Sequence, residues 1–189
     1  MKNDPWKIIE EGFHPDYHQA SESIFSLGNG KMGQRANFEE QYSGPSLQGS
    51  YIAGVYYPDK TRVGWWKNGY PGYFAKVLNA PNYIGIHLKV DGEALDLFTC
   101  ATSDFVRTLD MKKGLLTRSF TATLSGDKKI KVETARFLSM TDAETALLRF
   151  SVTPLNFSGK IELTPYLDGD VENEDANYDE KFWNILETA

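Results

Sequence analysis

The side chains of this sequence that are best suited to chemistry are aromatic, and they gather in one stretch. Residues 51–83 contain pairs of tyrosines and tryptophans separated by glycines. Such rings combine an apolar face with a polar edge, so they can stack on a pyranose ring or pack in a protein interface. The sugar-contact candidates are Trp65, Trp66, Tyr70 and Tyr73. Two interpretations stay open, a sugar-binding cleft and a structural or interface cluster.

Carboxylates are the second group that could do chemistry. Cleavage of a glycosidic bond requires two carboxyl groups that flank it. Glu10-Glu11, Glu22 and Glu39-Glu40 supply carboxylates, but in a chain with 26 acidic residues such pairs arise by chance. The sequence therefore assigns no catalytic residue.

A glycine motif follows the apolar run at residues 24–27. Residues 28–33 read GNGKMG and match the G-x-G-x-x-G spacing of a dinucleotide-binding loop. That loop requires a helix directly behind it, and the turn residues at 42–45 come too soon to leave room for one. We interpret these glycines as a turn between strands.

The potential metal ligands and thiols are few. His14 and His18 have i, i+4 spacing, but Pro15 lies between them and no third ligand is near in sequence. His87 falls in an expected strand, where we expect a structural, hydrogen-bonded role. Cys100 is the single cysteine, so no internal disulfide forms, and we expect a small core residue. The sequence predicts no metal site and no cofactor.

Composition and charge exclude several classes of partner. The chain has 189 residues and a formal net charge of −6, so no basic stripe could neutralise the phosphates of a nucleic acid. No apolar run approaches the length of a membrane span. The polar start lacks the apolar segment of a signal peptide, and we expect a cytoplasmic protein.

The elements that must position these residues are strands. Apolar or alternating runs over residues 84–90, 93–99, 115–124, 129–137, 145–153 and 160–166 are separated by tight turns, among them Asp91-Gly92. This spacing predicts an all-β, antiparallel sandwich with little helix. We expect short helical turns only near residues 5–12 and after residue 178. Residues 51–83 form a long excursion between strands, and the acidic residues 168–180 form a surface loop or linker.

Several segments, in a fixed order, carry a resemblance to a known family. Residues 22–35 read ESIFSLGNGKMGQR and residues 49–56 read GSYIAGVY. Both resemble the opening signature of glycoside hydrolase family 65. Further segments fall in the order expected for that family, namely 78–83, 109–118, 136–140, 152–156 and 167–169.

The resemblance implies a domain arrangement and a parent activity. Family 65 comprises maltose, trehalose and kojibiose phosphorylases and some hydrolases. Its members join a large amino-terminal β-sandwich, a supersandwich of the galactose-mutarotase-like type, to a catalytic (α/α)6 barrel. The resemblance thus implies a sandwich domain over residues 1–175 and the start of a linker over residues 176–189. The general-acid glutamate belongs to the barrel, so no family catalytic residue has a position in this chain.

Two functional hypotheses follow from these observations. The first is a non-catalytic domain that supports its own barrel, and that contributes to the active-site mouth or a homodimer interface. Its parent would act with inversion on an α-linked disaccharide and phosphate. The alternative is a self-standing, lectin-like carbohydrate-binding module that uses the aromatic residues of 51–83. An independent all-β hydrolase is the weakest interpretation, because nothing singles out a carboxylate pair.

Overall fold

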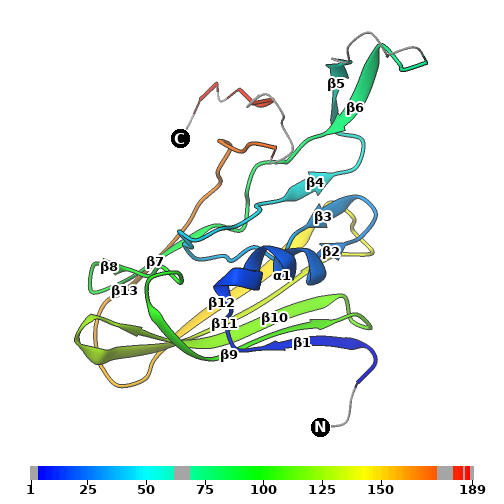
Figure 1. Cartoon of the computed structure of the whole chain (residues 1–189). Coiled ribbons are helices and arrows are strands. Elements are labelled where there is room, and N and C mark those ends of the chain that lie inside the picture. Colours follow the sequence, from blue (N-terminus) through cyan, green and yellow to red (C-terminus); the bar gives the residue numbers. More distant parts are fainter. Residues whose placement is uncertain (1–3, 62–68, 174–180, 185, 188–189) are drawn as a thin grey trace.

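The computed structural model describes residues 4–61, 69–173, 181–184 and 186–187. In this part of the chain the fold is all-β and antiparallel, with one short α-helix (Figure 1). The strands are β1 (Lys7–Glu11), β2 (Leu27–Gly28), β3 (Met32–Gln34), β4 (Ser50–Ile52), β5 (Tyr56–Lys60), β6 (Tyr73–Val77), β7 (Ile86–Val90), β8 (Glu93–Ala94), β9 (Ala101–Asp110), β10 (Leu115–Leu124), β11 (Lys128–Leu138), β12 (Ala146–Pro154) and β13 (Ile161–Pro165). The helical elements are η1 (Pro15–Tyr17), α1 (His18–Ile24) and η2 (Ser125–Asp127).

The largest sheet has five strands in the order β1-β9-β10-β11-β12. Every second residue of β10 is buried, as expected for a strand with one face against a core. Smaller sheets with the orders β13-β7-β8 and β2-β3-β4 lie on the other side of that core, and β5-β6 forms a separate ribbon (Figure 1). The predicted all-β, antiparallel architecture is confirmed.

The local predictions from sequence are partly right. Asp91 and Gly92 both have positive φ, 49° and 86°, as a tight hairpin turn requires. The glycine motif at residues 28–33 forms the turn between β2 and β3. The expected strand over residues 93–99 is wrong beyond residue 94. There the Asp96 carboxylate accepts N–H bonds from Ser43 and Phe98 and folds the chain into a turn.

The helix also lies elsewhere than expected. Residues 7–11, within the expected helical turn, form β1 instead and pair with the edge of β9. The helical segment begins at Pro15, whose fixed φ suits a first turn. It then continues into α1, which was not predicted because its seven residues carry too short an apolar pattern to recognise.

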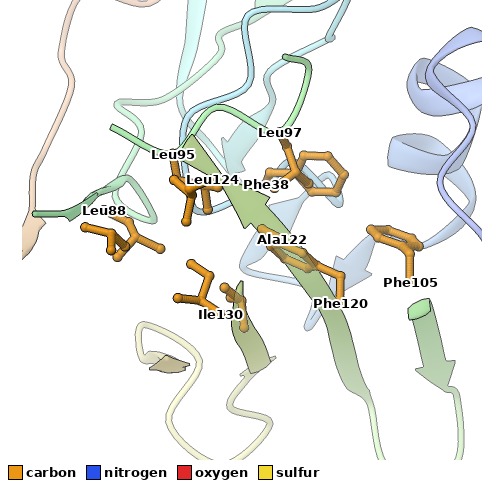
Figure 2. Packing of buried hydrophobic residues seen from close by; sticks show 11 residues of the cluster. Phe38, Leu88, Leu95, Leu97, Phe105, Phe120, Ala122, Leu124 and Ile130 are labelled. Atoms are coloured by element: carbon orange, nitrogen blue, oxygen red, sulfur yellow. The ribbon is translucent and has the colours of Figure 1, made fainter. Parts of the chain in front are cut away.

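The main core lies between the five-stranded sheet and the segments that cover its inner face. Figure 2 shows Phe120, Ala122 and Ile130 of the sheet facing Leu88, Leu95 and other residues of the covering segments. Cys100 packs against this cluster, as predicted, and burial raises the pKa of its thiol to about 11. The core is thus built by residues 36–42 and 86–97 closing over β9, β10 and β11.

Three arginines interrupt this apolar face. Arg107, Arg118 and Arg136 occupy inward positions on β9, β10 and β11, and each is at most 5% exposed. Arg107 lies directly opposite Arg118 in the strand register. A buried arginine is stable only when carboxylates or other acceptors satisfy it.

Neighbouring glutamates supply those acceptors. Arg118 donates to Glu39 at 2.6 Å and to Glu40 at 2.5 Å. Arg136 lies 3.5 Å from the other oxygen of Glu39, and Arg107 donates to Glu10 at 2.8 Å. We call these residues the ionic layer: Glu10, Glu39, Glu40, Arg107, Arg118 and Arg136.

The ionic layer divides the interior into two apolar clusters. Along β10, Arg118 lies between Leu116 of one cluster and Phe120 of the other. Along β9, Arg107 likewise separates Leu109 from Phe105. Since Glu39 and Glu40 belong to a segment without regular structure, these ion pairs fasten that segment to the sheet.

A second buried carboxylate fastens the segment around residue 47. The Glu22 side chain of α1 is completely buried and lies 3.1 Å from the Nε2 atom of His18. It also accepts hydrogen bonds from Asn37, from Ser46 and from the backbone N–H of Leu47. The start of β4 is thereby tied to α1.

We predict that replacing Arg118 is far more costly than replacing an exposed arginine of the same sheet. Arg118→Met leaves Glu39 and Glu40 buried without their main partner, and loss of a buried partner typically costs about 3–5 kcal/mol. Arg149→Met, on the exposed side of β12, should change the free energy of unfolding by less than about 0.5 kcal/mol. Urea denaturation measures both. Equal effects would contradict the structural role of the ionic layer.

We also predict an acid-dependent loss of stability. Burial raises the pKa of Glu39, but the charges of Arg136 and Arg118 outweigh it and hold the pKa below the usual value of 4.5. The unfolded chain therefore binds more protons below about pH 4.5, and the free energy of unfolding falls as the pH drops toward the folded pKa.

The variant Glu39→Gln tests this assignment. It should be less stable at neutral pH, and its free energy of unfolding should change less between about pH 5 and pH 3. Glu144→Gln, at a side chain that is 79% exposed, should show the same change in the free energy of unfolding with pH as the wild type. If the free energy of unfolding of Glu39→Gln depends on pH as in the wild type, another group causes the loss of stability in acid.

Candidate functional site: the projecting hairpin

The hairpin of β5 and β6 projects away from the rest of the molecule (Figure 1). Its register pairs Tyr56 with Val77 and Tyr57 with Lys76. Because side chains alternate along a strand, this register separates two faces. One face presents Tyr56, Pro58, Lys60, Tyr73, Ala75 and Val77, and the other presents Tyr57, Asp59, Phe74 and Lys76.

A groove of about 360 Å³ lies between the first of these faces and the sheet of β3 and β4. We call it the apolar groove. Several of its side chains remain exposed, including Val77 at 58% and Tyr56 at 59%. It is lined by Gly30, Lys31, Met32, Gly33, Tyr51, Ile52, Ala53, Gly54, Val55, Tyr56, Ala75 and Val77.

A second groove, of about 440 Å³, lies between the hairpin and residues 181–184. We call it the mixed groove because aromatic and charged side chains alternate around it. Tyr73 and Tyr57 are 62% and 45% exposed. It is lined by Tyr57, Pro58, Asp59, Lys60, Tyr73, Lys181, Phe182 and Asn184.

Residues 181–184 are held against the hairpin by ring and charge contacts. The rings of Phe182 and Tyr57 lie 4.9 Å apart with an interplanar angle of 45°, and the Lys76 Nζ lies 5.5 Å from the Phe182 ring centre. Lys181 pairs with Asp170 at 2.5 Å, and its hydrogen bond to Asp170 raises its pKa. These contacts therefore fix residues 181–184, one wall of the mixed groove, to the hairpin, which forms the other wall.

The root of the hairpin is organised by Asn79. Its buried amide accepts a hydrogen bond from the Ser50 backbone and donates to Gln48 and to the backbone oxygen of Glu172. Its backbone oxygen accepts a 2.8 Å hydrogen bond from the indole N–H of Trp183. This single residue thus joins β4, the base of β6 and the chain that follows β13.

The four predicted sugar-contact residues do not lie together in one described site. Tyr73 lines the mixed groove. Tyr70 lies beside Phe74, with ring centres 6.2 Å apart. Trp65 and Trp66 lie outside the described residues.

Sequence reasoning missed the other two rings of the mixed groove. Tyr57 was visible as part of the aromatic stretch but was not singled out. Phe182 gave no signal, because its contact with β5 depends on tertiary structure alone.

Several of the carboxylates and histidines considered from the sequence contact other side chains of the fold. Glu10, Glu39 and Glu40 pair with arginines of the ionic layer, and Glu22 is buried beside His18. The ring of His87 stacks on Tyr166 at 4.4 Å. Within the described ranges no group of three potential metal ligands occurs, and no helix has the length and apolar character that crossing a membrane requires.

Comparison with known proteins places this fold in a family. The family model for the glycosyl hydrolase family 65 N-terminal domain matches residues 8–189. The chain belongs to this family and corresponds to its N-terminal domain.

Several similar proteins are phosphorylases. Maltose phosphorylase of Bacillus subtilis (strain 168) is 51% identical over 180 residues, which are 95% of this chain and 24% of that protein. Kojibiose phosphorylase of Thermoanaerobacter brockii is 34% identical over 92% of this chain and 21% of its own length. The solved structure of a putative kojibiose phosphorylase from human microbiome matches with a TM-score of 0.72 and 38% identity, over 80% of this chain and 20% of that one. The chain thus spans less than a quarter of the relatives it matches.

We predict that Asn79→Ala loosens residues 168–173 and 181–184. The change leaves the Ser50 N–H and the Glu172 carbonyl without their partner, at a cost of about 1–3 kcal/mol. Hydrogen exchange should accelerate in residues 168–173 and 181–184. As the matched control, Ser50→Ala removes a buried hydroxyl that has no hydrogen-bond partner in the described part of the chain, and it should leave exchange unchanged. Unchanged hydrogen exchange in Asn79→Ala would show that Asn79 does not hold these residues in place.

Proposed function

We propose that this chain is the non-catalytic N-terminal β-sandwich domain of a phosphorylase-like enzyme of family 65. The parent enzyme would join residues 1–175 as the sandwich domain, through a linker that begins at residues 176–189, to an (α/α)6 barrel. That barrel would cleave an α-linked disaccharide with phosphate, with inversion at the anomeric carbon. The length of the named relatives supports this proposal, since each is more than four times as long as the segment it shares with this chain.

The apolar groove is the surface that we assign to docking of the barrel. Its exposed side chains, such as Tyr56 and Val77, would lose their contact with water on docking. A barrel docked in this groove would lie next to the root of the projecting hairpin, on the face opposite to residues 181–184 (Figure 1). In this arrangement the hairpin borders the active-site mouth or a homodimer interface. We also expect the whole enzyme to be cytoplasmic.

No catalytic residue is assigned to this chain, because Glu39 and Glu40 are bound by Arg118. Glu22 is likewise occupied by the hydrogen-bond donors described above. A preparation of residues 1–189 should therefore release no glucose 1-phosphate from maltose, trehalose or kojibiose in the presence of phosphate. Turnover by such a preparation would contradict the proposal. So would a stop codon directly after codon 189.

We predict that Val77→Asp weakens docking without weakening the fold. Val77 is 58% exposed, so the change should alter the free energy of unfolding of the 189-residue chain by no more than about 0.5 kcal/mol. In the longer gene product it should lower the melting temperature and the phosphorylase activity, because a charge would be buried at the domain interface.

Leu155→Asp is the matched control for this experiment. Leu155 is 50% exposed and follows β12, away from the hairpin. The change should leave both chain lengths unaffected. If Val77→Asp behaves like Leu155→Asp in the longer protein, the apolar groove is not the docking surface.

A further inference from the structure

The mixed groove differs from the apolar groove in the chemistry of its walls. The apolar groove is lined almost entirely by apolar side chains and glycines, with one lysine. In the mixed groove three aromatic rings alternate with four charged or amide side chains. A surface of the first kind suits another protein, whereas a few polar groups placed among rings are typical of a small-molecule site.

The mixed groove is large enough for a small ligand. Its volume of about 440 Å³ falls within the range of roughly 300–1,000 Å³ for ligand sites. Tyr57 and Lys60, which pairs with Tyr73, are three residues apart on β5. That separation is roughly 10 Å along a strand and puts the two side chains on opposite faces of the hairpin. The rings of Tyr57 and Tyr73 therefore line the mixed groove at separate positions.

The charges around the mixed groove are largely compensated. Lys76 lies 3.9 Å from Asp59, and Lys181 is paired with Asp170 and Glu172. Paired charges produce a weak net field, so the groove offers donors and acceptors without attracting an ion strongly. This favours an uncharged ligand that has an apolar face and many hydroxyl groups.

We propose that the mixed groove is a carbohydrate-binding site for pyranose sugars, separate from any catalytic site. One pyranose ring would place its C–H face on Tyr57, with Phe182 closing one side, and a second ring of the same sugar would reach Tyr73 farther along the groove. Its hydroxyls would contact Asp59, Lys60 and Asn184 at the rim. The site does not depend on the docking of a barrel, because the described residues form it within this chain.

Maltose titration of the 189-residue chain tests the proposal by calorimetry and by ligand-detected NMR. We expect saturable binding with a Kd on the order of 1 mM. Sorbitol has a similar set of hydroxyls but no ring face, and it should not bind. Inorganic phosphate should not compete with maltose.

Variants that line the two grooves locate the binding. Tyr57→Ala and Tyr73→Ala should each weaken maltose binding about tenfold, whereas Tyr57→Phe should retain it because the ring is kept. Tyr56→Ala is the matched control, since Tyr56 is about as exposed as Tyr73 but lines the apolar groove. Melting temperatures of all variants should match that of the wild type.

Three results would overturn the proposal: no saturable binding of maltose, equal binding of sorbitol, or equal loss of binding in Tyr56→Ala. Each is distinguishable from a failure of the docking proposal, which concerns Val77 and the longer protein. Displacement of maltose by phosphate would likewise contradict the site, because an anion would then be the ligand.

Discussion

The ion pairs between Glu39, Glu40 and Arg118 are the interaction on which the rest of the structure depends. They lie inside the core, where desolvation makes an unpaired charge very unfavourable. They therefore allow one arrangement of the segment around residue 40 over the sheet, because any displacement would leave charges buried without partners. An apolar contact in the same place would stabilise the fold, but it would tolerate sliding.

From this layer a continuous set of polar contacts leads to the hairpin. Asn37 lies two residues before Glu39 and donates to Glu22, which also binds the Leu47 N–H. The segment after Leu47 enters β4, whose first residue, Ser50, bonds to Asn79. Each of these hydrogen bonds uses at least one buried side chain, so each is directional in a way that apolar packing is not. The hairpin thus projects from a root whose position is set by the core.

The sequence predicted the sheet well because its strands carry local signals. Alternation of apolar and polar residues over 129–137 and the Asp91-Gly92 turn are visible within a few residues. It missed α1, whose apolar pattern is too short to recognise. It also missed β1 and the turn at Asp96, because they depend on partners far along the chain, β9 for β1 and Ser43 for Asp96. The inward arginines also look like ordinary exposed positions until their glutamate partners are located.

The candidate site was predictable only in its composition, for the same reason. The aromatic stretch at 51–83 drew attention to Tyr73, yet composition could not show that the hairpin has two unlike faces. That difference follows from register: a shift by one residue would exchange Tyr56 with Tyr57 and bring Lys76 to the apolar side.

The contacts of Phe182 with Tyr57 and Lys76 hold residues 181–184 to one face of the hairpin. The opposite face keeps its apolar groove and its exposed rings. Register and these long-range contacts together therefore decide where on the hairpin a protein partner fits and where a small polar ligand fits.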